Sequence, residues 1–251
     1  MTIFYFTSTG NSLYVAKRIG GTLVSIPQAL KETSKHYQND VIGFVFPCYG
    51  WGIPNIVQHF IKATKFEAEY FFAVMTYGNI PAGGLWHMEK IAEKVGLGFH
   101  YTAEILMVDN YLPVYKMERQ LEKEPGKKIE EQIAVITSDI SNRANRKVTK
   151  GIGATMASAV MQKMYRLRRG DVDKKFYIND ACTNCKICQK VCPKGNIELK
   201  EGPVYLHKCD YCMGCINLCP QNAIHLKGQR STARFRNRHV SLDEIIVANE
   251  Q

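Results

Sequence analysis

The chain has 251 residues, of which 45% are hydrophobic, and carries a formal net charge of +10. This length allows one large or two modest domains, and no stretch is long and apolar enough to span a bilayer. No charged segment followed by an apolar run suggests a secretory leader, so we expect a cytoplasmic, reducing setting.

The first part of the chain alternates short apolar runs with amphipathic segments. Apolar runs over 3–6, 41–46 and 70–75 predict buried parallel strands. Each run ends in a loop and leads into apolar residues at helical spacing, over 13–19, 56–61 and 85–95. Residues 99–108 predict the last strand, and four isoleucines spaced by four, three and four residues over 129–140 predict a covering helix.

The loop after the first strand has the composition of an anion site. It reads Thr7-Ser8-Thr9-Gly10-Asn11-Ser12 and leads into a helix. Hydroxyl groups and the N–H groups of a first helical turn bind phosphate, and the helix dipole favours its charge. Because the loop lacks the lysine of an ATPase loop, it suits one phosphomonoester, such as that of FMN. The alternative is an ordinary strand-to-helix turn.

Two further loops follow the second and third predicted strands, at the edge where open parallel sheets bind ligands. This order of features resembles a flavodoxin over roughly residues 1–165. The resemblance implies an α/β fold with a doubly wound parallel sheet, and FMN bound by the phosphate loop and by both later loops. The implied flavin contacts are Pro47, Tyr49, Gly50, Trp51, Thr76, Tyr77, Gly78, Asn79, Gly83 and Gly84. Tyr49 or Trp51, and Tyr77, are candidates to stack on the ring.

Several residues near these loops have less distinctive patterns. We expect Trp86 in the core and Cys48 as a small packing residue rather than a reactive thiol. The seven histidines form no metal-binding spacing. A helical stripe of Met156, Val160, Met161 and Met164 predicts packing against the core or a second domain, the alternative being a cofactor wall. The first domain is expected over 1–168, with a charged linker over 169–175.

Residues 176–228 contain eight of the nine cysteines in two copies of one pattern, Cys-x2-Cys-x2-Cys-x3-Cys-Pro. Ile197, Leu199 and Lys200 recur 27 positions later as Ile224, Leu226 and Lys227. In such runs three cysteines hold one [4Fe-4S] cluster and the fourth binds the other cluster. We therefore assign one centre to Cys182, Cys185, Cys188 and Cys219, and the other to Cys209, Cys212, Cys215 and Cys192.

Disulfides and zinc are the alternatives for these cysteines. Disulfides need an oxidising compartment, and zinc modules space two cysteine pairs apart without a third cysteine at the same interval. The module resembles a bacterial-type ferredoxin with two [4Fe-4S] clusters, and all eight ligand positions and both Cys-Pro steps match. A small hairpin is expected between the two cluster loops, over 197–199 and 204–206.

The last segment, 229–251, is basic through Arg230, Arg234, Arg236 and Arg238. We expect a solvated or protein-docking tail, with a nucleic-acid patch as the alternative. Ser241 and Glu244 fit a capping box, which predicts a short terminal helix.

The two halves together resemble the flavodoxin–ferredoxin fusion family. This resemblance implies an electron-transfer flavoprotein that moves single electrons between two [4Fe-4S] clusters and FMN, and exchanges them with a redox protein. The alternatives are an FMN-dependent reductase of a small molecule and, less favoured, a redox sensor. Two oxidised clusters and a flavin phosphate would reduce the net charge to about +4, which favours an acidic protein partner over nucleic acid.

Overall fold

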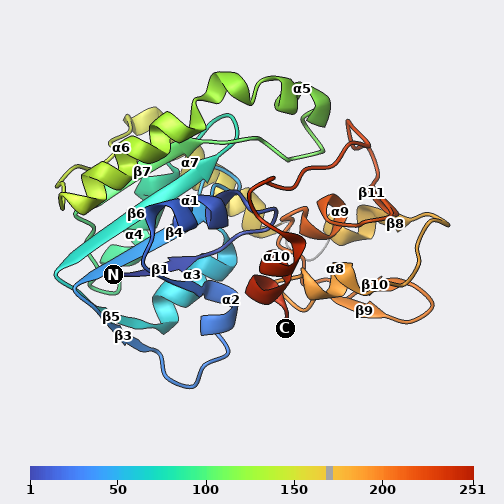
Figure 1. Cartoon of the computed structure of the whole chain (residues 1–251), viewed down its shortest axis with the longest axis horizontal. Coiled ribbons are helices and arrows are strands. Elements are labelled where there is room, and N and C mark those ends of the chain that lie inside the picture. Colours follow the sequence, from blue (N-terminus) through green and yellow to red (C-terminus); the bar gives the residue numbers. More distant parts are fainter. Residues whose placement is uncertain (168–171) are drawn as a thin grey trace.

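The computed structural model describes residues 1–167 and 172–251. Its centre is a five-stranded parallel sheet in the order β2-β1-β4-β6-β7, shown on the left in Figure 1. This is the strand order of a flavodoxin-like, doubly wound sheet, so the predicted α/β fold is confirmed. The strands are β1 (Thr2–Tyr5), β2 (Thr22–Ser25), β4 (Val41–Pro47), β6 (Tyr70–Tyr77) and β7 (Tyr101–Leu106).

Helices cover both faces of the sheet, which explains why its strands are apolar throughout. Ile3 and Tyr5 point to the face covered by α1 (Asn11–Ile19) and α6 (Ile129–Ser141). Phe4 and Phe6 point to the opposite face, covered by α3 (Asn55–Ala63) and α4 (Gly84–Glu93). The four helices predicted from apolar spacing are therefore all present. Trp86, expected in the core, is half-buried on α4.

A further helix, α7 (Ile152–Leu167), packs against α4. Its buried residues are polar, Ser158 and Gln162. Met156, Val160 and Met164 are exposed and Met161 is half-buried, so the expectation that this stripe packs against the core or a second domain was wrong for three of its four residues.

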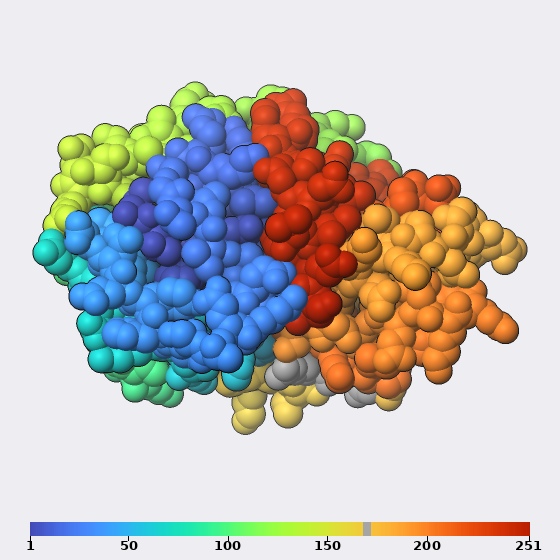
Figure 2. Space-filling view, turned by 60° about the horizontal axis from the view of Figure 1, so that its bottom comes forward, coloured from blue at the N-terminus to red at the C-terminus, as the bar shows by residue number. Residues whose placement is uncertain are grey.

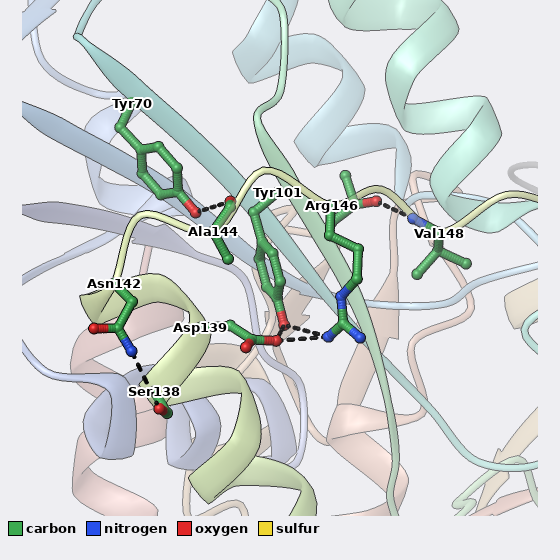
Figure 3. Close-up of polar contacts among 9 residues, drawn as sticks. Tyr70, Tyr101, Ser138, Asp139, Asn142, Ala144, Arg146 and Val148 are labelled. Atoms are coloured by element: carbon green, nitrogen blue, oxygen red, sulfur yellow. Dashed lines mark hydrogen bonds and ion pairs between the residues drawn. The ribbon is translucent and has the colours of Figure 1, made fainter.

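The basic connector before α7 is held to the edge of the sheet by polar contacts, shown in Figure 3. The Tyr101 hydroxyl donates to Asp139 Oδ2 at 2.9 Å, and Arg146 Nη2 lies 2.6 Å from the same oxygen. The Tyr70 hydroxyl donates to the Ala144 carbonyl at 2.7 Å. These contacts join β6, β7 and α6 to the connector and so fix the start of α7.

The second unit, on the right in Figure 1, is built from two similar halves. β8 (Phe176–Ile178) pairs antiparallel with β11 (Ile224–Leu226), and the predicted hairpin is present as β9 (Ile197–Leu199) and β10 (Pro203–Tyr205). Two short helices, α8 (Ile187–Lys190) and α9 (Gly214–Asn217), each contain the third cysteine of a run.

The charged stretch before this unit is only partly open to solvent. Within η2 (Val172–Lys175), Asp173 is buried and accepts a hydrogen bond from Asn196 Nδ2 at 2.9 Å. Asp173 also lies 2.7 Å from His207 Nδ1. Asp173 therefore packs on the second unit, while the rest of the expected linker, 169–171, lies outside the described residues.

The C-terminal segment does not extend into solvent, so the expectation of a solvated tail was wrong. Phe235, Val240 and Ile245 are buried. Val240 and Ile245 share one hydrophobic cluster with Val191 of the second unit and with the sheet face covered by α1 and α6. Figure 2 shows this segment, in red, between the sheet domain and the second unit. The predicted terminal helix is present as α10 (Leu242–Asn249), and its Ser241–Glu244 capping box is confirmed.

Short elements with weak apolar patterns were missing from the sequence-based prediction. Edge strand β2 has only four residues and a polar residue at each end. The others are α2 (Ile26–Ala29), β3 (His36–Gln38), β5 (Lys65–Glu67), α5 (Met117–Glu122) and η1 (Pro125–Lys127). Elements of three to six residues show too little periodicity to be distinguished from loops.

His87 of α4 makes a pH-dependent hydrogen bond with Ile53, in the loop that follows β4. Its Nδ1 accepts a hydrogen bond from the Ile53 N–H at 3.4 Å, and burial lowers its pKa to about 4. Protonation therefore favours the unfolded chain, so stability is retained above pH 6.5 and lost as pH falls towards 4. We expect a loss of up to about 3 kcal/mol from this group.

Urea unfolding of the holoprotein between pH 7 and 4.5 tests this expectation. The His87→Asn variant, which keeps an acceptor for Ile53, should show a smaller loss than the wild type. His59→Asn, at an exposed position on α3, is the matched control. Equal pH dependence in wild type and His87→Asn would contradict the assignment.

Candidate functional site

The eight cysteines of the second unit line two separate cavities. Cys192, Cys209, Cys212 and Cys215 line one, which we call the proximal cavity. Cys182, Cys185, Cys188 and Cys219 line the other, the distal cavity. The last cysteine of each run therefore lies with the first three of the other run, which is the grouping expected from the sequence. The ligand assignment itself stays a prediction.

Left-handed backbone conformations shape both cysteine loops. Asn184 and Lys186 have φ angles of 54° and 66°, and Tyr211 and Met213, 27 positions later, have φ angles of 56° and 60°. Such values are unfavourable for residues other than glycine and persist only where the surroundings impose them. Two such residues in each run curl the chain so that its thiols line one cavity.

Backbone N–H groups point at sulfur in both halves. The N–H of Asn196 lies 3.4 Å from Cys192 Sγ, and that of Ala223, at the equivalent position, lies 3.3 Å from Cys219 Sγ. The Tyr211 N–H lies 3.3 Å from Cys209 Sγ. Hydrogen bonds of this kind stabilise charge on cluster sulfur and tune the reduction potential.

The chemistry of the cavities suits an iron–sulfur cube. Burial raises the pKa of Cys188 to about 11 and that of Cys212 to about 12. These thiols therefore stay protonated at neutral pH unless a metal centre binds the sulfur in place of the proton. Over residues 1–167 and 172–251, no three His, Cys, Asp or Glu side chains converge closely enough to hold a single ion. The thiols instead surround a space, which is the arrangement that a larger group needs.

The two cavities differ in their surroundings. Each cavity has one buried cysteine, Cys188 or Cys215, but only the distal cavity has an exposed one, Cys185. The proximal cavity faces the sheet domain, since a β-carbon added to Gly214 would lie 3.5 Å from the Ser8 carbonyl oxygen. The distal cavity is therefore the nearer to solvent, and the proximal one lies beside the predicted phosphate loop.

The phosphate loop keeps donors available for an anion. Gly10 has a φ of 103°, and the N–H groups of Asn11 and Ser12 in the first turn of α1 find no acceptor in the described part of the chain. Thr7 Oγ1 accepts from the Gly10 N–H at 3.1 Å, and Thr9 Oγ1 accepts from Asn110 Nδ2 at 2.5 Å. Hydroxyls that only accept retain their hydrogen for a ligand. The residues present therefore fit the phosphate of FMN.

The C-terminal segment covers this loop. The Asn237 N–H donates to the Thr9 carbonyl at 2.8 Å, and its Nδ2 donates to Asn11 Oδ1 at 3.1 Å. Asn249 Nδ2 donates to the Thr7 carbonyl at 3.0 Å. Sequence reasoning missed these residues because no local pattern links positions so far apart in the chain.

The second predicted flavin loop touches the first. The Tyr49 hydroxyl donates to Ser8 Oγ at 3.0 Å, and its ring packs edge-on against Phe6. Trp51 is half-buried at a left-handed position, with a φ of 57°. Gln162 of α7 donates to the carbonyls of Tyr49 and Gly50 at 2.6 and 2.9 Å. The structure thus brings Tyr49 to the phosphate loop, while stacking on a flavin stays a prediction.

The third predicted loop lies beside the second, because Pro47 pairs with Thr76 at the ends of β4 and β6. Thr76 Oγ1 shares a hydrogen bond of 2.9 Å with Ser12 Oγ. The rest of the loop is held by side chains of later elements: Gly78 by Lys127, Asn79 by Tyr115 and Gly83 by Ser158. Tyr77 is half-buried, and Gly84 packs on Met75 and near Cys48.

Cys48 behaves as a packing residue. Burial raises its pKa to about 12, so the thiol is protonated at neutral pH and is a poor nucleophile.

Further contacts join the sheet domain to the proximal cavity. The rings of Tyr111, after β7, and Tyr211, between two proximal cysteines, meet edge to face at 5.6 Å. Asn55 Nδ2 donates to Asp210 Oδ1 at 3.1 Å, and the Tyr165 hydroxyl donates to the Asp210 carbonyl at 2.6 Å. One signal could have pointed to Tyr111, which is its position after a predicted strand at the ligand-binding edge of the sheet.

Comparison with known proteins supports iron–sulfur chemistry in the second unit. Residues 181–224 match the model of the 4Fe-4S dicluster domain family. No curated protein matches the chain.

Two solved structures are similar to part of the chain. One, from Bacteroides uniformis and described as a flavoprotein, is 15% identical with a TM-score of 0.34, over 48% of this chain and 95% of its own. The Trp repressor binding protein of Bacillus subtilis is 13% identical with a TM-score of 0.35, over 54% of this chain and 94% of its own.

Proposed function

We propose that this protein is an electron-transfer flavoprotein in which two [4Fe-4S] clusters connect a redox partner with bound FMN. The observation that carries the proposal is the closeness of the proximal cysteine loop to the phosphate loop, since a β-carbon added to Gly214 would lie 3.5 Å from the Ser8 carbonyl oxygen. One cluster cavity thus adjoins the predicted flavin site and the other lies nearer to solvent. A one-electron carrier beside a flavin allows single electrons to be combined into pairs, or pairs to be divided.

In this proposal the chain's own residues hold and insulate the centres. Cys192, Cys209, Cys212 and Cys215 bind the proximal cluster, and Cys182, Cys185, Cys188 and Cys219 bind the distal one. Thr7 to Ser12 bind the FMN phosphate, and the loops at Tyr49 and Tyr77 bracket the ring. Tyr111 and Tyr211 pack edge to face between the two domains.

The partner is proposed to be an acidic redox protein that docks near the distal cavity. Cys185 is exposed there, and the loaded protein keeps a net positive charge. Complementary charge accelerates the encounter of such partners and makes it sensitive to salt.

Anaerobic redox titration followed by absorbance and EPR tests the cofactor content. We expect one flavin and two cluster signals. The order of electron flow is tested with Cys185→Ser, which should slow flavin reduction by a reduced iron–sulfur protein at least about tenfold. Cys48→Ser is the control, and its flavin should be reduced at the wild-type rate.

Material without flavin or iron would contradict the proposal, as would equal reduction rates in Cys185→Ser and wild type. Steady turnover of a small acceptor, with no exchange with carrier proteins, would favour the reductase alternative.

A further inference from the structure

Helix α7 buries polar side chains and exposes apolar ones, which is the opposite of the usual arrangement in a surface helix. Its inward side presents Ser158 and Gln162, which bond to the backbone of the two later loops. Its outward side forms one apolar stripe at intervals of four, four, four and three residues. The stripe consists of Ile152, Met156, Val160, Met164 and Leu167, exposed by 79%, 65%, 59%, 39% and 74%.

An exposed apolar stripe of this length is unusual on a soluble protein and marks an interaction surface. Ser158 and Gln162 bond inward, and the Tyr165 hydroxyl also donates inward, to the Asp210 carbonyl. These bonds determine which side of α7 faces solvent. In Figure 2 the yellow part of the chain, which includes α7, lies at the lower outline of the molecule. The stripe therefore faces solvent.

The charge around the stripe is positive. From Ser141 to Leu167 the chain has no Asp or Glu and six Lys or Arg residues. Three of these, Arg143, Arg146 and Lys150, form ion pairs with residues outside the segment. On α7 itself Lys163 and Arg166 form no ion pair among the described residues, and both are exposed.

We propose that the outward face of α7 binds the surface of an anionic lipid bilayer. Apolar side chains on one helical stripe with adjacent Lys and Arg residues, and no acid, are the features of a helix that lies in a membrane interface. The apolar residues enter the headgroup boundary, while the long side chains of Lys163 and Arg166 reach the lipid phosphates.

The positive charge argues against a second copy of the chain as the partner of this face. In such a dimer Lys163 and Arg166 of one copy would lie near those of the other and repel them. The binding proposed is peripheral. No helix in the described part of the chain is long and apolar enough to cross a membrane. The inference does not depend on either cofactor.

Co-sedimentation with vesicles tests the proposal on the full-length holoprotein. We expect it to bind vesicles of phosphatidylcholine with 30% phosphatidylglycerol, and to bind pure phosphatidylcholine at least tenfold more weakly. Val160→Glu should weaken binding to the anionic vesicles at least tenfold. Val135→Glu, on α6 and exposed by 56%, is the matched control and should bind like the wild type.

Three results would overturn the proposal. The first is equal binding of Val160→Glu and wild type, and the second is failure of the wild type to bind anionic vesicles. The third is a wild-type dimer in sedimentation velocity that Val160→Glu converts to a monomer, since the stripe would then be a contact between copies. Loss of flavin or iron would leave all three results interpretable.

Discussion

Replacing Cys192 with serine is expected to remove the proximal cluster and leave the distal one, although Cys192 belongs to the first cysteine run. Its side chain lines the cavity of Cys209, Cys212 and Cys215, so the loss of its thiolate leaves that cluster with three cysteines. Iron content should fall from about eight to about four atoms per chain, with one EPR signal lost. A ligation confined to each run would instead lose the distal signal.

Double variants distinguish the crossed arrangement from a general loss of folding. Cys192→Ser combined with Cys209→Ser should lose no more iron than either change alone, because both remove one cluster. Cys192→Ser combined with Cys182→Ser should lose nearly all the iron, because the two residues line different cavities. Cys48→Ser should keep the full content. Equal iron in the two double variants would contradict the assignment.

Placing a carboxylate in the phosphate loop is expected to weaken FMN binding strongly and selectively. Ser12 is buried in the first turn of α1, where the helix dipole and free N–H groups stabilise a negative charge. The carboxylate of Ser12→Asp would take the place of the phosphate group, so the fold tolerates it while the ligand is excluded. We expect FMN affinity to fall at least about a hundredfold, or roughly 2.8 kcal/mol.

The neutral variant Ser12→Asn and the ligand riboflavin are the controls. Ser12→Asn should bind FMN far better than Ser12→Asp, and riboflavin, which lacks the phosphate, should bind Ser12→Asp and Ser12→Asn alike. Isothermal titration of the flavin-depleted protein measures all four affinities. If Ser12→Asp weakens riboflavin and FMN equally, the loop does not bind the phosphate.

Elements with a repeated local signal were predictable from the sequence. The apolar runs at β1, β4 and β6 predict buried strands. The isoleucine spacing of α6 predicts a helix with one buried face. The grouping of Cys192 with Cys209 was also expected, because in runs of this pattern the fourth cysteine binds the other cluster. These features depend on residues close together in the chain or on an exact repeat.

Features that depend on distant contacts were not predictable in this way. The basic residues 229–239 suggested a solvated tail, yet Asn237 bonds to the phosphate loop and Val240 is buried against it. The stripe of α7 has the same spacing whether it faces a core or solvent. The bonds of Ser158 and Gln162 to the glycine-containing loops, and of Tyr165 to Asp210, decide its orientation, and no local pattern reveals them.

The bond between Asn249 and the Thr7 carbonyl joins positions 242 residues apart. Because the predicted phosphate loop is synthesised early and Asn249 late, this support can join the loop only after all five strands of the sheet have been made. The geometry of the loop is therefore completed by one of the last segments of the given chain to be synthesised.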